Sequence, residues 1–297
     1  MPSNRSRLRP SPSETWAFDA IGAPWRIETA EPLDDDVRAA VAARVESFDR
    51  TWSRFRDDSL VSRIAHEPGS WRLPAEAGPL LDLYRALYEA TDGAVSPLVG
   101  RTLEQLGYDR AYSLRSTGSA SAPPAWDDAI AWDGEALTTV APVLLDVGAA
   151  GKGYLVDLVC GVLAEGGVDD VVVDASGDIR IVGSGVTRVA LEHPLDTSKA
   201  IGVARLAHGA LCASASNRRS WGDGLHHVID ATTGLPTSTV IATWVTAPTA
   251  LLADGLATGL FFAEATRFAG LGDFSWVRMF STGRVQHSPD FDGELFL

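Results

Sequence analysis

Segments with helical and with strand periodicity follow one another along this chain without a regular strand–helix–strand alternation. Apolar residues recur at roughly every 3.6 positions in residues 37–52 and 77–91, which predicts two amphipathic helices. An alternating stretch at residues 17–28 predicts a pair of strands around Gly22. Because a doubly wound parallel sheet requires regular alternation, the pattern favours the α+β class, with mixed sheets and packed helices.

The second half of the chain continues this mixture at shorter intervals. Residues 144–146 read as a strand, followed by a loop of small residues as far as Gly153 and a helix over residues 155–164. Residues 171–173 and 179–181 flank the turn Ala175-Ser176-Gly177-Asp178 and predict a hairpin or a bulged pair of strands. Further strands are expected at residues 187–192, 202–206 and 240–245, and a helix at residues 250–268.

Two segments lack the periodicity of either a helix or a strand. Residues 1–15 are rich in Ser, Pro and Arg, so we expect a disordered N-terminal tail, with order beginning near Trp16. Residues 115–125 (RSTGSASAPPA) contain few large apolar groups and predict a surface loop or short linker. We therefore expect one domain over residues 16–297. This domain can consist of two lobes, separated by the loop at residues 115–125.

Composition and charge exclude several classes of protein. The chain is 45% hydrophobic and 22% charged, as in ordinary globular proteins, and its net charge of −14 argues against a nucleic acid partner. No apolar run approaches the roughly 20 residues of a membrane-spanning helix. The first residues show neither a secretory signal nor a lipid-acceptor cysteine, so we expect no membrane anchor and a cytoplasmic location. Cys160 and Cys212 stand in apolar segments and are expected to be buried and unpaired.

Residues 146–154 (DVGAAGKGY) form the first segment that suggests ligand binding. Small side chains allow the backbone to approach a ligand closely, and the helix that follows offers free N–H groups to phosphate oxygens. The segment matches neither the P-loop nor the GxGxxG pattern, so a purely structural turn is the alternative. Lys152 favours the functional interpretation because it is one of only two lysines in the chain.

Asp254 and Thr258 form a second candidate, inside an otherwise apolar helix. Their i, i+4 spacing places both oxygens on one helix face. An ionised carboxylate in such a segment is unfavourable unless it is paired or binds a cation, and oxygen ligands select hard ions such as Mg²⁺. The alternative is a helix-capping Asp254, with Thr258 bonded back to a helix carbonyl.

His226 and His227 are adjacent in a segment that reads as extended. Their side chains therefore point to opposite sides, and at most one of them faces any given site. No HExxH or Cys/His spacing accompanies them, so the sequence does not indicate zinc. Residues 214–219 (SASNRR) suit either phosphate contact or ordinary solvation, and no GxSxG elbow supports a serine hydrolase.

Taken in order, these segments resemble the ApbE family, the FAD:protein FMN transferases, from Ile21 to the end of the chain. Residues 146–157 (DVGAAGKGYLVD) resemble the family's DLGGIAKGYAVD, residues 227–236 (HVIDATTGLP) its HIIDPRTGYP, and residues 253–258 (ADGLAT) its ADALAT. Residues 52–64 (WSRFRDDSLVSRI), 91–100 (TDGAVSPLVG) and 175–178 (ASGD) are similar to its S-x-Y-x-x-x-S-x-L-S-R-L, TGGAFDPTVG and GGD motifs. The resemblance implies the T-fold-like architecture of that family.

The resemblance also implies an enzyme that binds FAD with Mg²⁺ or Mn²⁺, cleaves its diphosphate and releases AMP. FMN would be attached through a phosphoester to a Ser or Thr of an acceptor protein. By the same analogy Asp254, Thr258 and the main-chain carbonyl of Ala149 would hold the metal, and His227 would be the general base that deprotonates the acceptor hydroxyl. The residues implied to contact FAD are Ile21, Phe55, Ala94, Val95, Ser96, Asp146, Lys152 and Val228.

Two departures from the family pattern fall in segments expected near the flavin, and two other functions stay open. Val95-Ser96 stands where the family has Phe-Asp, and Ser214-Ala215-Ser216 where it has Thr-Ser-Gly, so pocket shape or FAD affinity is expected to differ. One alternative function is a metal-dependent FAD pyrophosphatase that uses water as the acceptor. The other is a flavin-binding or storage protein without transfer activity. The missing lipid-acceptor cysteine suggests an intracellular acceptor protein.

Overall fold

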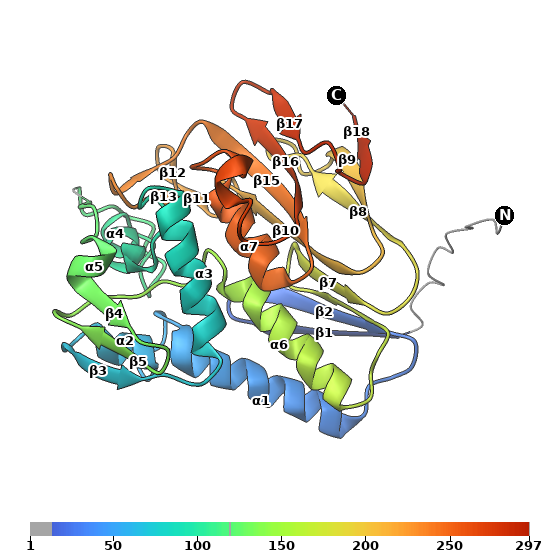
Figure 1. The fold of residues 1–297 in the computed structure, drawn as a ribbon, viewed down its shortest axis with the longest axis horizontal. Coiled ribbons are helices and arrows are strands. Elements are labelled where there is room, and N and C mark those ends of the chain that lie inside the picture. Colours follow the sequence, from blue (N-terminus) through green and yellow to red (C-terminus); the bar gives the residue numbers. More distant parts are fainter. Residues whose placement is uncertain (1–13, 119, 297) are drawn as a thin grey trace.

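An eight-stranded antiparallel sheet forms the centre of the fold (Figure 1) in the computed structural model, which describes residues 14–118 and 120–296. The strand order is β1-β2-β6-β7-β10-β15-β16-β17, so the N-terminal hairpin lies at one edge of the sheet. Neighbouring strands pair antiparallel throughout. The strands are β1 (Glu14–Ala20), β2 (Ala23–Thr29), β6 (Val171–Asp174), β7 (Asp178–Val182), β10 (Gly209–Ala215), β15 (Val240–Ala247), β16 (Ser275–Phe280) and β17 (Val285–His287).

The two faces of this sheet are covered differently. Helices α6 (Gly151–Glu165) and α7 (Ala250–Gly259) pack on one face, and α1 (Asp35–Trp52) and α3 (Ala77–Ala90) pack against these helices (Figure 1). The other face meets a three-stranded sheet of β8 (Thr187–Glu192), β9 (Ala200–Leu206) and β18 (Gly293–Leu295). The result is a layer of helices, a large sheet and a smaller sheet.

Strand β10 shows why the large sheet can be buried on both faces. Ala210 and Cys212 belong to the apolar core beneath the helices, whereas Leu211 belongs to the core between the two sheets. This alternation follows from the two-residue repeat of a strand. Cys160 and Cys212 are both buried and unpaired, which confirms the expectation from the sequence.

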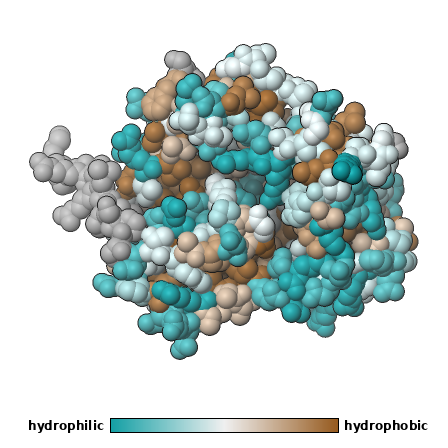
Figure 2. Space-filling view, turned by 180° about the vertical axis from the view of Figure 1, so that it is seen from behind, coloured by the Kyte–Doolittle hydropathy of each residue, from teal (hydrophilic) through white to brown (hydrophobic). Residues whose placement is uncertain are grey.

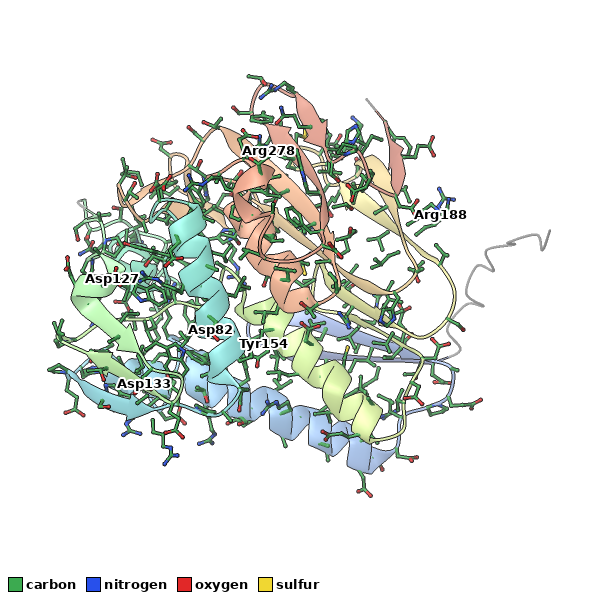
Figure 3. The ribbon with its side chains drawn as sticks, viewed as in Figure 1. Asp82, Asp127, Asp133, Tyr154, Arg188 and Arg278 are labelled. Carbon is green, nitrogen blue, oxygen red and sulfur yellow. The ribbon has the colours of Figure 1, made fainter. Side chains whose placement is uncertain are left out.

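A smaller group of elements packs beside α3. Figure 3 labels two side chains that join its surroundings: Asp82 on α3 accepts a hydrogen bond from Trp132 Nε1 at 3.2 Å, and Tyr154 on α6 donates to the Glu76 carbonyl oxygen at 2.7 Å. Helix α3 is thereby fixed to the small sheet on one side and to α6 on the other. The group consists of the sheet β3 (Gly69–Arg72), β5 (Ala136–Thr139) and β4 (Ile130–Trp132), with α2 (Leu60–Ile64), η1 (Pro97–Val99), α4 (Gly100–Gln105) and α5 (Trp126–Ala129).

The connection from β10 to β15 is made of two short hairpins. The first pairs β11 (Ser220–Trp221) with β12 (Leu225–His226), and the second pairs β13 (Ile229–Asp230) with β14 (Leu235–Pro236). The carbonyl oxygen of Ala94 accepts a hydrogen bond from the Ala231 N–H at 3.0 Å, so the second hairpin is held against the segment that follows α3.

The α+β class is confirmed, but the strand predicted for residues 144–146 is wrong. The Asp146 N–H donates to the Pro97 carbonyl oxygen at 2.8 Å, rather than to a strand neighbour. Leu144 and Leu145 are buried all the same, and burial without a strand produced the misleading apolar pattern. β1 begins at Glu14, so Glu14 and Thr15 belong to a strand instead of to the expected tail, whose residues 1–13 lie outside the described residues.

Two helix boundaries also differ from the prediction. α6 begins at Gly151 and not at residue 155. Gly151 and Gly153, which suggested a loop, lie in the first turn of the helix, and Gly153 packs against α7. The helix predicted for residues 250–268 ends at Gly259, and a separate 3₁₀ helix, η2 (Ala265–Phe268), follows. Leu260 and Phe261 pack into the core from the intervening turn, so the apolar spacing continues although the helix does not.

The surface carries both hydrophilic and apolar side chains, as expected from the composition of an ordinary globular protein. On the face behind that of Figure 1, apolar side chains reach the surface in several separate spots among hydrophilic ones (Figure 2). Scattered apolar groups of this kind are normal for a folded protein. Within the described residues, none of the helices combines the length and the apolar character required to cross a bilayer.

Gly153 permits the close contact between α6 and α7. A Cβ atom at this position would lie 2.2 Å from the Ala250 carbonyl oxygen and 2.6 Å from the Asp254 Cβ. Both neighbours belong to α7, so one of the helices has to move when a methyl group is added. We expect Gly153→Ala to lower the free energy of unfolding by about 3 kcal/mol, as overpacking of a core does.

The matched control is Gly161→Ala on the same helix, where an added Cβ meets nothing within 4 Å. That substitution should raise the free energy of unfolding by roughly 0.5–1 kcal/mol, because alanine favours the helix over glycine. Urea unfolding of both variants measures the difference. Equal midpoints for Gly153→Ala and the unaltered protein would contradict the packing argument.

Candidate active site

A cavity of about 610 Å³ opens where α1, α6 and α7 meet the β1–β2 turn. Its volume lies in the range of pockets that hold cofactors and other small molecules. The wall brings together segments that are far apart in the sequence. They include residues 21–24, 52–56, 146–149, 151–152, 176–178, 213–215, 218–219 and 227–229, together with Asp254 and Thr258.

Helix α3 fixes the loop at residues 146–150, which forms part of this wall. The Tyr84 hydroxyl oxygen accepts a hydrogen bond from the Ala149 N–H at 3.0 Å and lies 3.5 Å from the Asp146 carbonyl oxygen, to which it donates. Burial, together with the Asp146 carboxylate, raises the pKa of Tyr84 well above its ordinary value. The hydroxyl group therefore keeps its proton and holds both ends of the loop.

Asp146 is joined to an arginine that the sequence does not suggest as a site residue. Arg54 Nε donates to Asp146 Oδ2 at 2.6 Å, and the Gly148 N–H donates to Asp146 Oδ1 at 2.7 Å. Burial raises the pKa of Asp146, but the Arg54 guanidinium outweighs burial and holds that pKa below its usual value. Asp146 lines the cavity as an ionised carboxylate, with a donor already at each oxygen.

Three oxygen groups meet between the loop and α7. Thr258 Oγ1 donates to the Ala149 carbonyl oxygen at 3.2 Å, and Asp254 Oδ2 accepts from the Gly153 N–H at 2.9 Å. Asp254 and Thr258 both line the cavity, as expected from their spacing, with Thr258 against the loop that carries Ala149 and Asp254 against the first turn of α6. A carboxylate, a hydroxyl and a main-chain carbonyl are brought together in this way.

Asp254 does not cap its own helix, but its carboxylate does accept the Gly153 N–H from the first turn of α6. The N-terminus of α7 is capped by Thr249, whose side chain accepts from the Leu252 N–H at 3.3 Å. Asp157 on α6 accepts from the Ala250 and Leu251 N–H groups at 3.0 and 2.8 Å. The Thr258 hydroxyl bonds to Ala149 and not to a carbonyl of its own helix.

Lys152 and Asp178 lie next to this oxygen cluster. Lys152 Nζ is 2.7 Å from Asp178 Oδ2 and 2.7 Å from the Ala175 carbonyl oxygen, and it lies 3.4 Å from the Ser176 carbonyl oxygen. An ammonium group has three hydrogens, so these acceptors can occupy all of its donors. Lys152 lines the cavity, as do most of the other residues implied to contact FAD, and its charge is paired there with a buried carboxylate and the β6–β7 turn.

The buried charge around Asp254 fits a hard cation. Asp178 and Asp254 are 1% and 4% exposed, and no residue that the structure describes donates a hydrogen bond to Asp178 Oδ1. Burial and the Asp178 carboxylate raise the pKa of Asp254 well above its ordinary value, so Lys152 alone does not compensate both acids. Within the described part of the chain no three His, Cys, Asp or Glu side chains form a metal-binding group, so a cation here would rely on one carboxylate and neutral oxygens. Such a set suits Mg²⁺ or Mn²⁺ better than zinc.

The two adjacent histidines have different surroundings, as expected for an extended segment. His226 Nδ1 accepts from the Val228 N–H at 3.2 Å, so Nε2 carries the proton and donates to the Thr237 carbonyl oxygen at 2.7 Å. His227 lines the cavity, and among the described residues its Nδ1 has no hydrogen-bond partner. Burial, with the nearby positive charge of Arg219, lowers the pKa of His227 to about 3. The ring facing the cavity is therefore neutral near pH 7.

Most of the other residues implied by the resemblance share this cavity. Ile21, Phe55, Val95, Ser96 and Val228 all line it, as do the metal-site candidates Ala149, Asp254 and Thr258. Ala94 does not belong to the lining, and its carbonyl oxygen is bonded to the β13–β14 hairpin instead.

Sequence reasoning missed several side chains of the cavity wall. Tyr84 matches the apolar spacing of α3 and reads as an ordinary core residue. The sequence indicates only a turn at Asp178. Arg54 occupies a variable position of the motif that contains it, so the motif carries no signal for it. Tyr108 and Tyr112 lie in a segment without periodicity. Each of these contacts depends on tertiary packing rather than on local spacing.

A model of the ApbE family matches residues 21–272 of this sequence. The chain belongs to the ApbE family. Among its relatives is the FAD:protein FMN transferase of Klebsiella pneumoniae (strain 342), which is 25% identical over 303 residues and covers 91% of this chain and 86% of the relative. The FAD:protein FMN transferase of Rhodobacter capsulatus is 27% identical over 311 residues, and the match spans 96% of this chain but 59% of that longer protein.

Solved structures of ApbE proteins share the fold. The ApbE protein of Thermotoga maritima superposes with a TM-score of 0.78 at 23% identity, covering 93% of this chain and 97% of that one. The flavin transferase ApbE of Vibrio cholerae gives a TM-score of 0.78 at 20% identity over 94% of this chain and 97% of the other. The ApbE-like architecture expected from the motifs is therefore present.

Proposed function

We propose that this chain is a Mg²⁺-dependent FAD:protein FMN transferase, which cleaves FAD and attaches FMN to a Ser or Thr of an acceptor protein. One observation carries the proposal. Asp254, Thr258 and the Ala149 carbonyl converge in the same cavity that His227 lines, in a chain whose relatives are named FAD:protein FMN transferases. A hard-cation site and a neutral base are what this transfer requires.

The cation would be held by Asp254, Thr258 and the Ala149 carbonyl, on opposite sides of the α7–loop contact. When bound, a divalent cation supplies positive charge that offsets the charge developing on the phosphate oxygens as a P–O bond breaks. Tyr84 keeps the loop in register for this role, because its hydroxyl oxygen holds the Ala149 N–H at 3.0 Å. Asp157 fixes the start of α7 in a similar way, because its carboxylate accepts hydrogen bonds from the Ala250 and Leu251 N–H groups.

His227 would take the proton of the acceptor hydroxyl. The hydroxyl oxygen then forms a bond to the phosphorus of the FMN half, the bond from that phosphorus to the bridging oxygen breaks, and AMP leaves with the bridging oxygen. A base must be neutral before it accepts a proton, and His227 is neutral near pH 7, although the same lowered pKa makes it a weaker base than an ordinary histidine. With water in place of the acceptor hydroxyl the same geometry would give a pyrophosphatase.

Incubation of the purified protein with FAD, Mg²⁺ and a candidate acceptor tests the proposal. We expect AMP release together with an increase in the acceptor's mass by one FMN moiety, bound through a phosphoester. AMP and FMN in solution, with an unmodified acceptor, would indicate a pyrophosphatase. FAD bound without any cleavage would indicate a flavin-binding protein. The cytoplasmic location and the intracellular acceptor stay predictions from the sequence.

A further inference from the structure

The Phe55 ring, which is implied to contact FAD, is covered by a tyrosine from another segment. The rings of Phe55 and Tyr112 are parallel within 5°, with centroids 5.1 Å apart. Phe55 also contacts the Arg54 guanidinium, whose Cζ lies 4.2 Å from the ring centroid, and the edge of Tyr108 at 5.4 Å. Phe55 is thus part of a cluster of stacked groups on the cavity wall.

Among the groups that contact Phe55, Tyr112 is the least restrained. Arg54 is 2% exposed and is tied to Asp146, and Tyr108 is 4% exposed and stacked on Trp221. Tyr112 is 50% exposed although it is a large aromatic residue that lines the cavity. A ligand that enters the cluster can therefore displace Tyr112 more easily than its other members.

The backbone at Tyr112 is in an unfavourable conformation. Its φ is +48°, in the left-handed region that bulky side chains seldom adopt. The Asp109 carbonyl oxygen accepts from the Tyr112 N–H at 3.0 Å, and the Asp109 side chain accepts from the Ser113 N–H at 3.0 Å, so the turn is maintained by its own hydrogen bonds. Such outliers concentrate at functional sites, because the surrounding structure must compensate them.

The Tyr112 side chain also lies close to the β1–β2 turn. A Cβ at Gly22 would lie 3.6 Å from the Tyr112 hydroxyl oxygen, so the ring extends from Phe55 to the β1–β2 turn. Ile21 and Gly22 of that turn line the cavity as well. A planar group that displaced Tyr112 from Phe55 would therefore lie beside this turn.

The geometry points to Tyr112 as the movable half of an aromatic clamp: Tyr112, which is stacked directly on Phe55, moves away, and a planar heteroaromatic ring of the substrate binds between the two rings. This inference rests on the proposed function and adds a specificity-determining residue that the family motifs do not contain. The two parallel rings offer apolar faces instead of hydrogen-bond donors, so they select a flat ring over a sugar or a phosphate. Each ring system of FAD, adenine or isoalloxazine, has this character.

Binding of FAD to Tyr112 variants tests the clamp without requiring turnover. We expect Tyr112→Ala to raise the Kd for FAD by about tenfold, the size associated with loss of a stacked ring. Tyr112→Phe should bind FAD as the unaltered protein does, because it keeps the ring. The matched control is Leu114→Ala, since Leu114 is 44% exposed with a φ of +53° in the same segment but does not belong to the cavity lining.

The direction of the change decides between two roles for Tyr112. If Tyr112 only plugs an empty site, Tyr112→Ala will bind FAD more tightly, and the clamp is overturned. An unchanged Kd, or an effect confined to the KM for the acceptor protein, overturns it as well. Loss of affinity for riboflavin and FMN assigns the clamp to the isoalloxazine ring, and loss of affinity for ADP and AMP assigns it to adenine. A variant that weakens neither set of fragments contradicts the proposal.

Failure of the clamp and failure of the proposed function give different results. If the unaltered protein binds no FAD, the proposed function fails, and the clamp, which rests on it, fails as well. If the unaltered protein binds FAD and Tyr112→Ala binds it equally well, only the clamp fails. Thermal unfolding of each variant without ligand should stay close to that of the unaltered protein, because the Tyr112 ring is half exposed.

Discussion

Asp254→Asn will abolish both AMP release and FMN transfer, while the protein stays folded. The amide oxygen can still accept from the Gly153 N–H, which lies 2.9 Å from Asp254 Oδ2, so the contact of α7 with α6 persists. What is lost is the negative charge that a cation between α7 and the loop at residues 146–150 would require. We expect turnover at saturating FAD and Mg²⁺ to fall by at least a thousandfold, since metal-ion stabilisation supplies several kcal/mol of the transition-state free energy.

The stability of the same variant separates loss of the cation from loss of the fold. In the native protein the pKa of Asp254 is raised above its unfolded value. The folded state then binds more protons than the unfolded state at pH values above the unfolded pKa, so ionisation of Asp254 lowers stability as the pH rises. Without metal, Asp254→Asn should therefore be no less stable than the unaltered protein at pH 7.

Added Mg²⁺ should raise the midpoint of thermal unfolding of the unaltered protein but leave that of Asp254→Asn unchanged, because only the native site binds the ion. Mn²⁺ binding measured by electron paramagnetic resonance offers a readout that does not depend on catalysis. Thr258→Ser, which keeps the hydroxyl group, serves as the conservative control and should keep most of the activity. Undiminished turnover or undiminished Mn²⁺ binding in Asp254→Asn would show that the metal assignment is wrong.

The parts of this site that could be predicted from the sequence are those whose geometry is local. Asp254 and Thr258 share a helix face because of their spacing. His226 and His227 face different surroundings as predicted, although β12 ends at His226 and His227 lies in the bend that follows. In both cases a few backbone angles determine where the side chains point. The hairpin around the turn at residues 175–178 was predictable for the same reason, and it is present as β6 and β7.

The parts that could not be predicted depend on contacts between distant segments. Arg54 and Asp146 are 92 residues apart in the sequence, and Tyr84 meets Ala149 across 65 residues. The sequence likewise does not show that Asp178 lies 2.7 Å from the ammonium group of Lys152. The sequence of residues 144–146 resembles that of a strand because a buried segment is apolar whether or not it pairs with a neighbouring strand.

His227→Ala will leave FAD bound but slow FMN transfer at least a hundredfold, the contribution typical of a general base. The Kd for FAD and the mass of the flavinylated acceptor, followed over time, measure the two effects separately. His226 provides the matched control, because its ring bonds to Thr237 and Val228 and does not face the cavity. We expect His226→Ala to lower the free energy of unfolding by about 1–3 kcal/mol through its lost buried hydrogen bonds, with a smaller loss of transfer than His227→Ala. An inactive His226→Ala beside an active His227→Ala would overturn the assignment of the base.

Burial of His227 determines how this residue makes the stability of the protein depend on pH. The pKa of His227 is about 3 in the folded protein, below the ordinary value of 6.5 for histidine. The unfolded state therefore binds more protons between these two values, and the stability that neutral His227 contributes is lost as the pH falls through that interval. In His227→Ala this part of the acid destabilisation should disappear. The kcat/KM for transfer reports the free enzyme, so in the unaltered protein it should show no inflection near pH 6.5 from this group. An inflection there that is absent from the pH dependence of FAD binding would mean that His227 is exposed to water and titrates normally.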